Sequence, residues 1–387
     1  MTDQIPYRQP RAVLIAACLL SAAGGLLFNV MPVFLGSAAA RFALDDAQIG
    51  WVGSAYLGGF APIAATSFLW INRFNWRKLT LAGGAISVLS LAASALASGF
   101  VPLIAALICA GLGLGTLYTV GIAIVAENDN PDSAFGVKLA GETFLGVAML
   151  FALPLVFVGS RGFIGVALAM AAVTGLLGLI ALRSTPTRRE AAMAAQSPGH
   201  PARFERSALV GLAALFISFG GMTALWAFLE RIASDFGLTS QQATMVIAVC
   251  LVTNGLAAIA AAMLGDRLGR VLPLIAGMVC AIAGIAFLNW QHDLWGYAAG
   301  VFLTMGLSNL ALSYQMGLIA SSDGSGRSAV LIPAALAGGG AIGPALAGSL
   351  LGGAGYGPLY ALAATTTALS LIAFAWFART ISREEPT

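Results

Sequence analysis

Lys138 and Glu142 are prominent as candidates for proton chemistry, because they lie four residues apart inside a long apolar stretch, residues 134–158. At this spacing two side chains share one face of a helix and are separated by about 6 Å of rise. Glu142 falls roughly 12 Å along the helix from residue 134, whereas Lys138 is shallow enough to extend its ammonium group toward water. Burial disfavours a charged carboxylate and a neighbouring ammonium group favours it. We therefore expect the pair to bind and release a proton; a fixed structural ion pair is the alternative.

The helix that carries this pair is one of many apolar stretches. Hydrophobic residues make up 59% of the 387 residues and charged residues 9%, against roughly 25% charged residues in an ordinary soluble domain. Stretches of about 20 apolar residues can cross a hydrocarbon core about 30 Å thick as a helix. The expected membrane-spanning helices cover residues 12–36, 47–71, 77–98, 101–126, 134–158, 161–182, 207–230, 240–264, 271–290, 295–319, 327–353 and 357–379. The sequence thus predicts an all-α membrane protein with twelve transmembrane helices.

The basic residues are distributed unevenly between the expected loops. With the N-terminus in the cytoplasm, all of the 19 Lys and Arg residues except Arg41, Arg161 and Arg231 fall in cytoplasmic segments. Lys and Arg are retained on the cytoplasmic side of short loops. We therefore expect a multi-pass protein of the cytoplasmic membrane with both termini in the cytoplasm. The net charge of +3 then reflects topology rather than binding of nucleic acid.

The sequence also indicates an internal duplication. A polar segment, residues 183–206, separates an N-terminal bundle, residues 1–182, from a C-terminal bundle, residues 207–387, with six expected helices in each. At an offset of about 194 residues, Gln48 aligns with Gln242. Each glutamine follows an Asp or Thr by three residues, which is the capping-box spacing that begins a helix. Equivalent positions are six spans apart, so the two halves form a parallel, pseudo-symmetric repeat.

The stretch from Asp266 to Arg270 reads Asp-Arg-Leu-Gly-Arg and joins two expected helices. Together with the duplicated plan, it resembles the loop motif of the major facilitator superfamily of secondary transporters. The resemblance covers essentially the whole chain. In the matching loop of the first half Asn72 replaces the acid, so that loop departs from the motif. Its positive charges are retained by Arg73, Arg77 and Lys78. The resemblance implies two bundles that rock about a central cavity.

In a protein of this kind we expect the two loops to latch the cytoplasmic side. A carboxylate can accept hydrogen bonds from the free N–H groups at the start of a helix, where the macrodipole also favours negative charge. The pseudo-symmetry places Asp266 near residues 133–136 and Asn72 near residues 325–327, and the second contact is expected to be weaker because it lacks a charge. For Arg267 and Arg270, the alternative is that they only anchor a tight turn at the lipid headgroups.

The resemblance also suggests which uncharged side chains border the cavity. The candidates for contact with a solute are Asn29, Tyr118, Met222, Thr223, Trp226, Asn254 and Asn309. For each, the alternative is a hydrogen bond between helices or aromatic packing, and this alternative is most favoured for Asn254. None of them is basic, which favours an amphipathic or weakly polar solute over a strongly anionic one. Glu230, Arg231 and Asp235 are expected to form a solvated rim.

These patterns predict a secondary active transporter of a small organic solute that works by alternating access and is coupled to protons. Uptake of an organic acid, with Lys138 as the partner of the anion, is the alternative within transport. A non-transporting membrane sensor is the alternative from another class. The sequence has no zinc-protease, serine-hydrolase or phosphate-binding motif, so we expect neither an enzyme nor an ATP-driven pump, and no metal or cofactor. The expected partners are the solute, protons and the lipid bilayer, and the expected state is a monomer.

Overall fold

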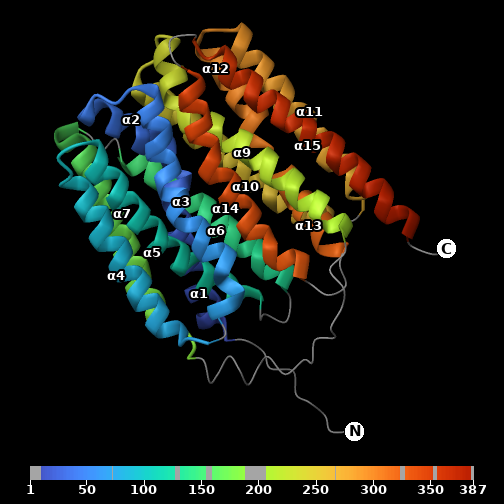
Figure 1. Cartoon of the computed structure of the whole chain (residues 1–387), viewed down its shortest axis with the longest axis horizontal. Helices are drawn as coiled ribbons and strands as arrows, with labels where there is room; N and C mark the ends of the chain where they lie inside the picture. The colour runs from blue at the N-terminus through green and yellow to red at the C-terminus, as the bar shows by residue number, and fades with distance from the viewer. Residues whose placement is uncertain are drawn as a thin grey trace.

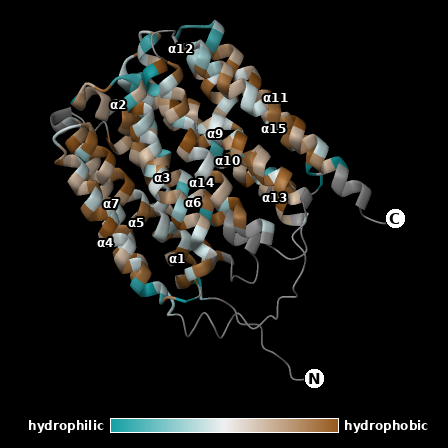
Figure 2. Cartoon of the chain, viewed as in Figure 1, coloured by the Kyte–Doolittle hydropathy of each residue, from teal (hydrophilic) through white to brown (hydrophobic). Residues whose placement is uncertain are grey.

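The computed structural model is a bundle of α-helices. It describes residues 10–71, 73–126, 131–153, 159–187, 206–265, 267–322, 327–351 and 355–384, and no strand occurs among them. Within these ranges, nine helices are long and apolar enough to cross a membrane by length and composition. Apolar residues cover the helices along much of their length, and hydrophilic residues gather near their ends (Figure 2). The prediction of an all-α, multi-pass membrane protein is confirmed.

The helices of the first half lie together and are here called the N-terminal group (Figure 1, blue to green). They are α1 (Arg11–Asn29), α2 (Met31–Phe42), α3 (Asp46–Trp70), α4 (Trp76–Ala95), α5 (Phe100–Ala126), α6 (Pro131–Ala152) and α7 (Gly159–Leu182). Helix α5 packs against α1, α3 and α4, and α1 also contacts α6 and α7. Helix α1 therefore contacts α5 and α6, the helices that carry Tyr118 and the Lys138–Glu142 pair.

The helices of the second half lie beside them and are here called the C-terminal group (Figure 1, yellow to red). They are α9 (Arg206–Asp235), α10 (Ser240–Leu264), α11 (Val271–Trp290), α12 (Leu294–Val301), the π-helix η2 (Phe302–Gly306), α13 (Ser308–Ser321), α14 (Arg327–Leu350) and α15 (Gly357–Glu384). Helix α9 packs against α14 and α15, and α11 packs against α13 and α15. The division into two six-helix bundles related by a repeat stays a prediction.

Two of the expected spans are interrupted, which the sequence analysis did not foresee. The first, expected as residues 12–36, divides at Val30 into α1 and α2. Pro32 has no N–H to donate to the carbonyl of Phe28 four residues earlier, so the helical ladder breaks there. The tenth, expected as residues 295–319, consists of α12, η2 and α13. Single π-helical turns inside helices are frequent at functional positions.

The predicted capping boxes are both present. Asp45 accepts from the backbone N–H of Gln48, whose side chain accepts from the N–H of Asp45, and α3 begins there. Thr239 and Gln242 make the same exchange at the start of α10. These reciprocal bonds satisfy N–H groups that a helix cannot pair internally, and they fix two equivalent helix starts.

The two groups meet most closely where α3 packs against α14, near Asp46. Small residues make this approach possible, because a Cβ on Gly50 would overlap the carbonyl oxygen of Pro344. Further along the contact, the backbone N–H of Ala345 donates to Ser54 Oγ at 2.9 Å. We call the end of the molecule where these contacts lie the Asp46 end. Contacts between α6 and α10, between α2 and α9 and between α3 and α9 also belong to the junction.

Candidate functional site

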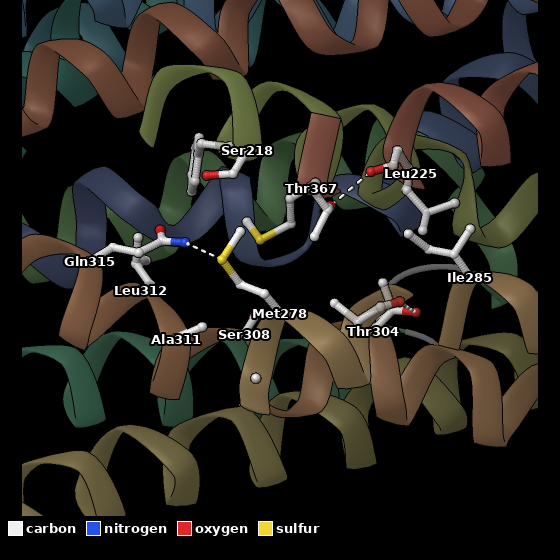
Figure 3. Close-up of a pocket in the computed structure, with 15 residues that line it drawn as sticks. Ser218, Leu225, Met278, Ile285, Thr304, Ser308, Ala311, Leu312, Gln315 and Thr367 are labelled. Atoms are coloured by element: carbon white, nitrogen blue, oxygen red, sulfur yellow. Dashed lines mark hydrogen bonds between the residues drawn. The ribbon is translucent and has the colours of Figure 1, made fainter. Parts of the chain in front are cut away.

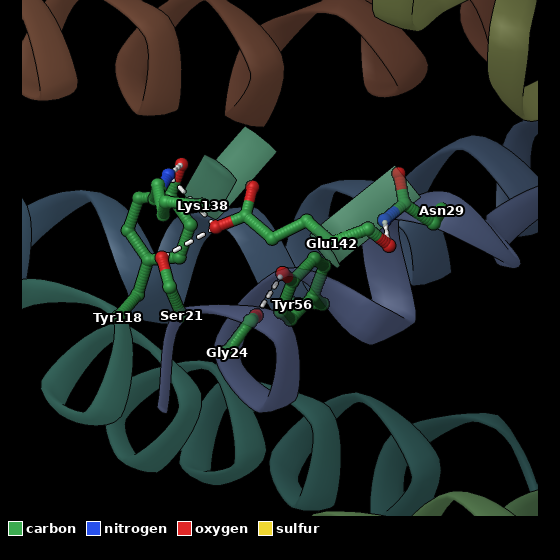
Figure 4. A network of polar contacts seen from close by, with 7 residues as sticks. All are labelled: Ser21, Gly24, Asn29, Tyr56, Tyr118, Lys138 and Glu142. Atoms are coloured by element: carbon green, nitrogen blue, oxygen red, sulfur yellow. Dashed lines mark hydrogen bonds and ion pairs between the residues drawn. The ribbon is translucent and has the colours of Figure 1, made fainter. Parts of the chain in front are cut away.

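The predicted pair on α6 forms a buried ion pair (Figure 4). Lys138 Nζ lies 2.8 Å from Glu142 Oε1, and their side chains are only 3% and 9% exposed. Lys138 Nζ also donates to the hydroxyl of Tyr118 at 2.7 Å and lies 4.1 Å from the centroid of that ring. The ammonium group is therefore held by a carboxylate, a phenol oxygen and an aromatic face, all of which favour its charge.

Helix α1 completes the network from the opposite side. Ser21 Oγ donates to Glu142 Oε1, and Asn29 Nδ2 donates to the backbone carbonyl of Glu142 at 3.0 Å. Among the described residues, Lys138 and Ser21 are thus both bonded to the same carboxylate oxygen of Glu142, Oε1. Its second oxygen, Oε2, lies 3.8 Å from where a Cβ on Gly25 would be. This arrangement leaves one carboxylate oxygen without a donor from the described chain, and a proton could bind there.

Glycines explain why α1 can approach so closely. A Cβ on Gly24 would overlap the backbone of Leu114 and the side chain of Tyr118, so α1 and α5 pack backbone to backbone at this position. A Cβ on Gly146 of α6 would overlap the side chain of Asn29. The hydroxyl of Tyr56 donates to the carbonyl of Gly24 at 3.2 Å and ties α3 to α1. Small residues at such positions allow helices in a membrane to pack closely and form hydrogen bonds.

Ser21 and Tyr56 were not among the site residues predicted from the sequence. The only signal in the sequence was the small-residue pattern Ser21-x-x-x-Gly25, which is typical of helix packing but does not specify the partner. Asn29 and Tyr118 were expected to contact a solute, and the structure brings both into the Lys138–Glu142 network instead. Their solute role stays a prediction, now tied to the ion pair.

Trp226 and its neighbours lie at the junction of the two groups. Trp226 Nε1 donates to the carbonyl of Phe28 at 2.8 Å, the same carbonyl that Pro32 leaves without a helical donor. The ring of Phe28 stacks on Phe219 at 5.7 Å and on Trp226 at 6.4 Å between ring centroids. An aromatic cluster thus joins the break in the first span to α9 of the other group.

The described hydrogen bonds of the other candidates of the C-terminal group lie within that group. Thr223 is fully buried, and its hydroxyl donates to backbone carbonyls of its own helix, those of Phe219 and Gly220. Asn254 Oδ1 accepts from the backbone N–H of Asn309 at 2.9 Å and so holds the start of α13 beside the π-helix. The hydrogen bond between helices that was favoured for Asn254 is present.

Met222 lines a small cavity within the C-terminal group (Figure 3). The cavity has a volume of about 60 Å³ and is bordered by α9, α11, η2, α13 and α15. Gln315 and Thr304 supply polar groups to its wall, and Gln315 Nε2 donates to Met278 Sδ at 3.5 Å. A volume of this size holds a few water molecules and not an organic solute.

The predicted latch falls largely outside the described residues. Asn72 and Asp266 lie there, as do the side chains of residues 133–136 and 325–327. Of the basic residues, Arg77 Nε donates to the carbonyl of Thr185 at 2.6 Å, and Arg270 has a long contact of 3.4 Å with the carbonyl of Gly317. Thr185 lies in the segment that separates the two halves, and Gly317 belongs to the half that carries Arg270.

The remaining residues of the two loops make the following local contacts in the described chain. Asn75 caps α4 by accepting from the N–H groups of Arg77 and Lys78. The N–H groups of Arg73 and Arg267 donate within their own turns, to the carbonyls of Trp70 and Leu264. These contacts suit the anchoring of turns, and the latch itself stays a prediction.

The expected solvated rim at the end of α9 is different in the structure. Arg231 donates to Asp46 of α3 at 2.8 Å and so pairs the two groups. Glu230 lies against α2, and one of its carboxylate oxygens is buried. Asp235 is exposed, as expected. The expectation failed because it considered only the position of these residues at the end of a helix and not the group packed against it.

Comparison with known proteins gives two matches. Residues 211–387 match the sequence profile of the Major Facilitator Superfamily. The chain is also similar to the 3-(3-hydroxy-phenyl)propionate transporter of Escherichia coli (strain K12), with 30% identity over 173 residues. That match covers 44% of this chain and 41% of the length of that transporter.

Proposed function

Since this chain belongs, through its residues 211–387, to the major facilitator superfamily, we propose that it is a secondary transporter. Its cargo in this proposal is a small organic, amphipathic or weakly polar solute. The two groups of helices rock about a shared cavity, and Glu142 couples this motion to protons. The observation that carries the proposal is the buried pair of Lys138 and Glu142 on α6. A buried ionisable pair inside a membrane protein is expensive, and such pairs mark proton and substrate pathways.

Several of the described contacts between the groups lie at or toward the Asp46 end. They include Ser54 with the N–H of Ala345, Asp46 with Arg231, and the carbonyl of Phe28 with Trp226. The distribution of basic residues favours the exterior for this end. The proposal therefore assigns this structure to a state that is closed toward the exterior, with both termini in the cytoplasm.

In the proton step, the carboxylate of Glu142 and an anionic solute are alternative partners for the ammonium group of Lys138. When Glu142 takes up a proton, its attraction to the ammonium group of Lys138 is lost. A buried ammonium group without an anion is costly, so Lys138 then needs another anionic partner or access to water. A solute that carries a carboxylate would supply that partner, and the proton and the solute would bind together.

This step favours an organic acid as the second candidate for the solute. The cation at the centre of the network supports it, and so does the name of the similar Escherichia coli transporter, which states an aromatic carboxylic acid. An aromatic carboxylate is itself amphipathic, so both candidates fit the apolar and aromatic surroundings of the ion pair. The direction of transport follows the proton gradient if solute and proton move together.

The test uses the protein reconstituted in liposomes that contain a pH-sensitive dye. External 3-phenylpropionate and an uncharged aromatic amide of similar size are compared as solutes, with Glu142→Gln and the exposed control Asp235→Asn alongside the native chain. We expect solute-driven acidification in the native chain and in Asp235→Asn, and its loss in Glu142→Gln. Proton flux that persists unchanged in Glu142→Gln would remove Glu142 from the mechanism. Binding of a solute without any flux in the native chain would indicate a sensor.

A further inference from the structure

Glu230 of α9 lies at the junction of the two groups, where its carboxyl group packs against Gly36 of α2. Its Oε1 accepts from Ser240 Oγ at 2.5 Å. Its Oε2 is buried and has no hydrogen-bond partner among the residues that the structure describes. A Cβ added to Gly36 of α2 would overlap this carboxyl group. The carboxyl group of one helix group therefore rests directly on the backbone of the other.

The charged and titratable groups near Glu230 do not neutralise it. Within the described chain, the nearest cation along the sequence, Arg231, is paired with Asp46 of α3. On α2, Arg41 lies over the ring of Phe42. The other groups on this part of the junction are Tyr297 of α12, Tyr360 of α15, Tyr356 just before α15, and Asp235 on α9 itself.

The phenols in this set stay neutral. The hydroxyl of Tyr297 donates to the carbonyl of Leu229 at 3.1 Å and is committed to that bond. Burial raises the pKa of Tyr356 to about 12, although the neighbouring Arg231 opposes the shift. The phenol of Tyr356 therefore carries no charge near neutral pH. Glu230 is left with a serine hydroxyl as its described partner.

We propose that Glu230 is a proton-binding site whose occupation closes the Asp46 end. A carboxylate that is stripped of water without a cation or a second donor is costly, and the neutral acid is much less so. The close seat on Gly36 leaves no space for a larger ligand beside Oε2. When the groups separate at this end, water reaches the carboxyl group and the charged form becomes favourable again. Closing this end therefore takes up a proton.

This inference rests on the proposed rocking of the two groups, but it does not need Glu142 to titrate. Because the closed form holds the additional proton, the closed fraction should fall as the pH rises. If the junction stabilised the carboxylate form of Glu230 instead, the closed fraction would rise with pH. Glu142, deep in the N-terminal group, and Glu230, at the Asp46 end, would then sense different stages of the same cycle.

The test measures the distance across the Asp46 end in the full-length protein, without solute. Spin labels are placed at Leu96→Cys and Trp295→Cys, exposed positions of the two groups, in a chain whose four native cysteines are replaced. Pulsed electron resonance then gives the closed fraction between about pH 5 and pH 9. We expect this fraction to fall with pH in the native background and in the exposed control Asp235→Asn. In Glu230→Gln it should stay high throughout.

A second variant acts on the other side of the contact. Gly36→Ala displaces the carboxyl group from its seat and should lower the closed fraction at low pH, where the native chain is most closed. A pH response that is unchanged in Glu230→Gln, or no response in the native background, would overturn the proposal. Neither result depends on solute or on proton flux, so a failure of the transport proposal through Glu142 would be seen separately.

Discussion

Lys138 and Glu142 show how far single residues could be predicted. Their spacing of four residues is a local property, so the shared helix face and the ion pair between them follow from the sequence. The donors from Ser21 and Asn29 come from α1 and depend on tertiary packing that no local pattern specifies. For the same reason Glu230 was expected to be solvated, although its surroundings are set by Gly36, which is far away in the sequence.

At this scale, removing one partner of the ion pair should cost more than removing both. Lys138→Met leaves the buried carboxylate of Glu142 uncompensated, and we expect a loss of about 3 kcal/mol or more in unfolding free energy at neutral pH. The double variant Lys138→Met with Glu142→Gln should recover much of the loss. Unfolding in detergent measures these differences, and additive costs would contradict the pairing.

At the scale of helices, the sequence predicted most elements but not their interruptions. Apolar length and capping residues located α3, α4, α10 and α11 within a few residues. The break at Val30 has a local cause in Pro32, which the apolar run concealed. The π-helix η2 is followed by a contact that no local pattern specifies, in which Asn254 of a neighbouring helix accepts from the N–H of Asn309.

The close packing of α3 on α14 makes a prediction for glycine. Gly50→Val places a side chain where the carbonyl of Pro344 now lies, whereas Gly58 on the same helix has open space around it. We expect Gly50→Val to force the helices apart and reduce the closed fraction at the Asp46 end several-fold, and Gly58→Val to leave it unchanged. Crosslinking of cysteines placed in α3 and α14 measures the effect. Equal crosslinking in both variants would argue against this contact.

At the scale of the whole molecule, the two groups of helices are joined by the close packing of α3 on α14 and by polar contacts of modest strength. The pair of Arg231 and Asp46 is 40% and 29% exposed on its two side chains, and such pairs contribute about 0–1 kcal/mol. Weak contacts suit a junction that has to open and close. The duplication predicted from the loops stays a prediction. The contacts between the halves could not be predicted from the sequence, because they depend on which state the molecule adopts.

The bond from Trp226 to the carbonyl of Phe28 should contribute to closure. Trp226→Phe keeps an aromatic ring in the cluster and removes the N–H donor. We expect a loss of about 1 kcal/mol, a factor of about five in the ratio of closed to open molecules. The same spin labels at Leu96→Cys and Trp295→Cys measure this ratio. If Trp226→Phe were as closed as the native chain, the hydrogen bond would have no part in closure.

The two interrupted spans differ in where their exposed backbone finds a partner. Beside η2, the backbone N–H of Asn309 donates to Asn254 of the same group. This hydrogen bond can therefore be kept when the two groups move relative to each other. At the interruption near Val30, the carbonyl of Phe28 accepts from the indole N–H of Trp226 in the opposite group, and this bond breaks when the two groups separate. The hydrogen bond beside η2 is therefore independent of the contact between the groups, whereas the one at Val30 depends on it. The backbone of the first span thus has a hydrogen-bond partner that is present only while the two groups are in contact.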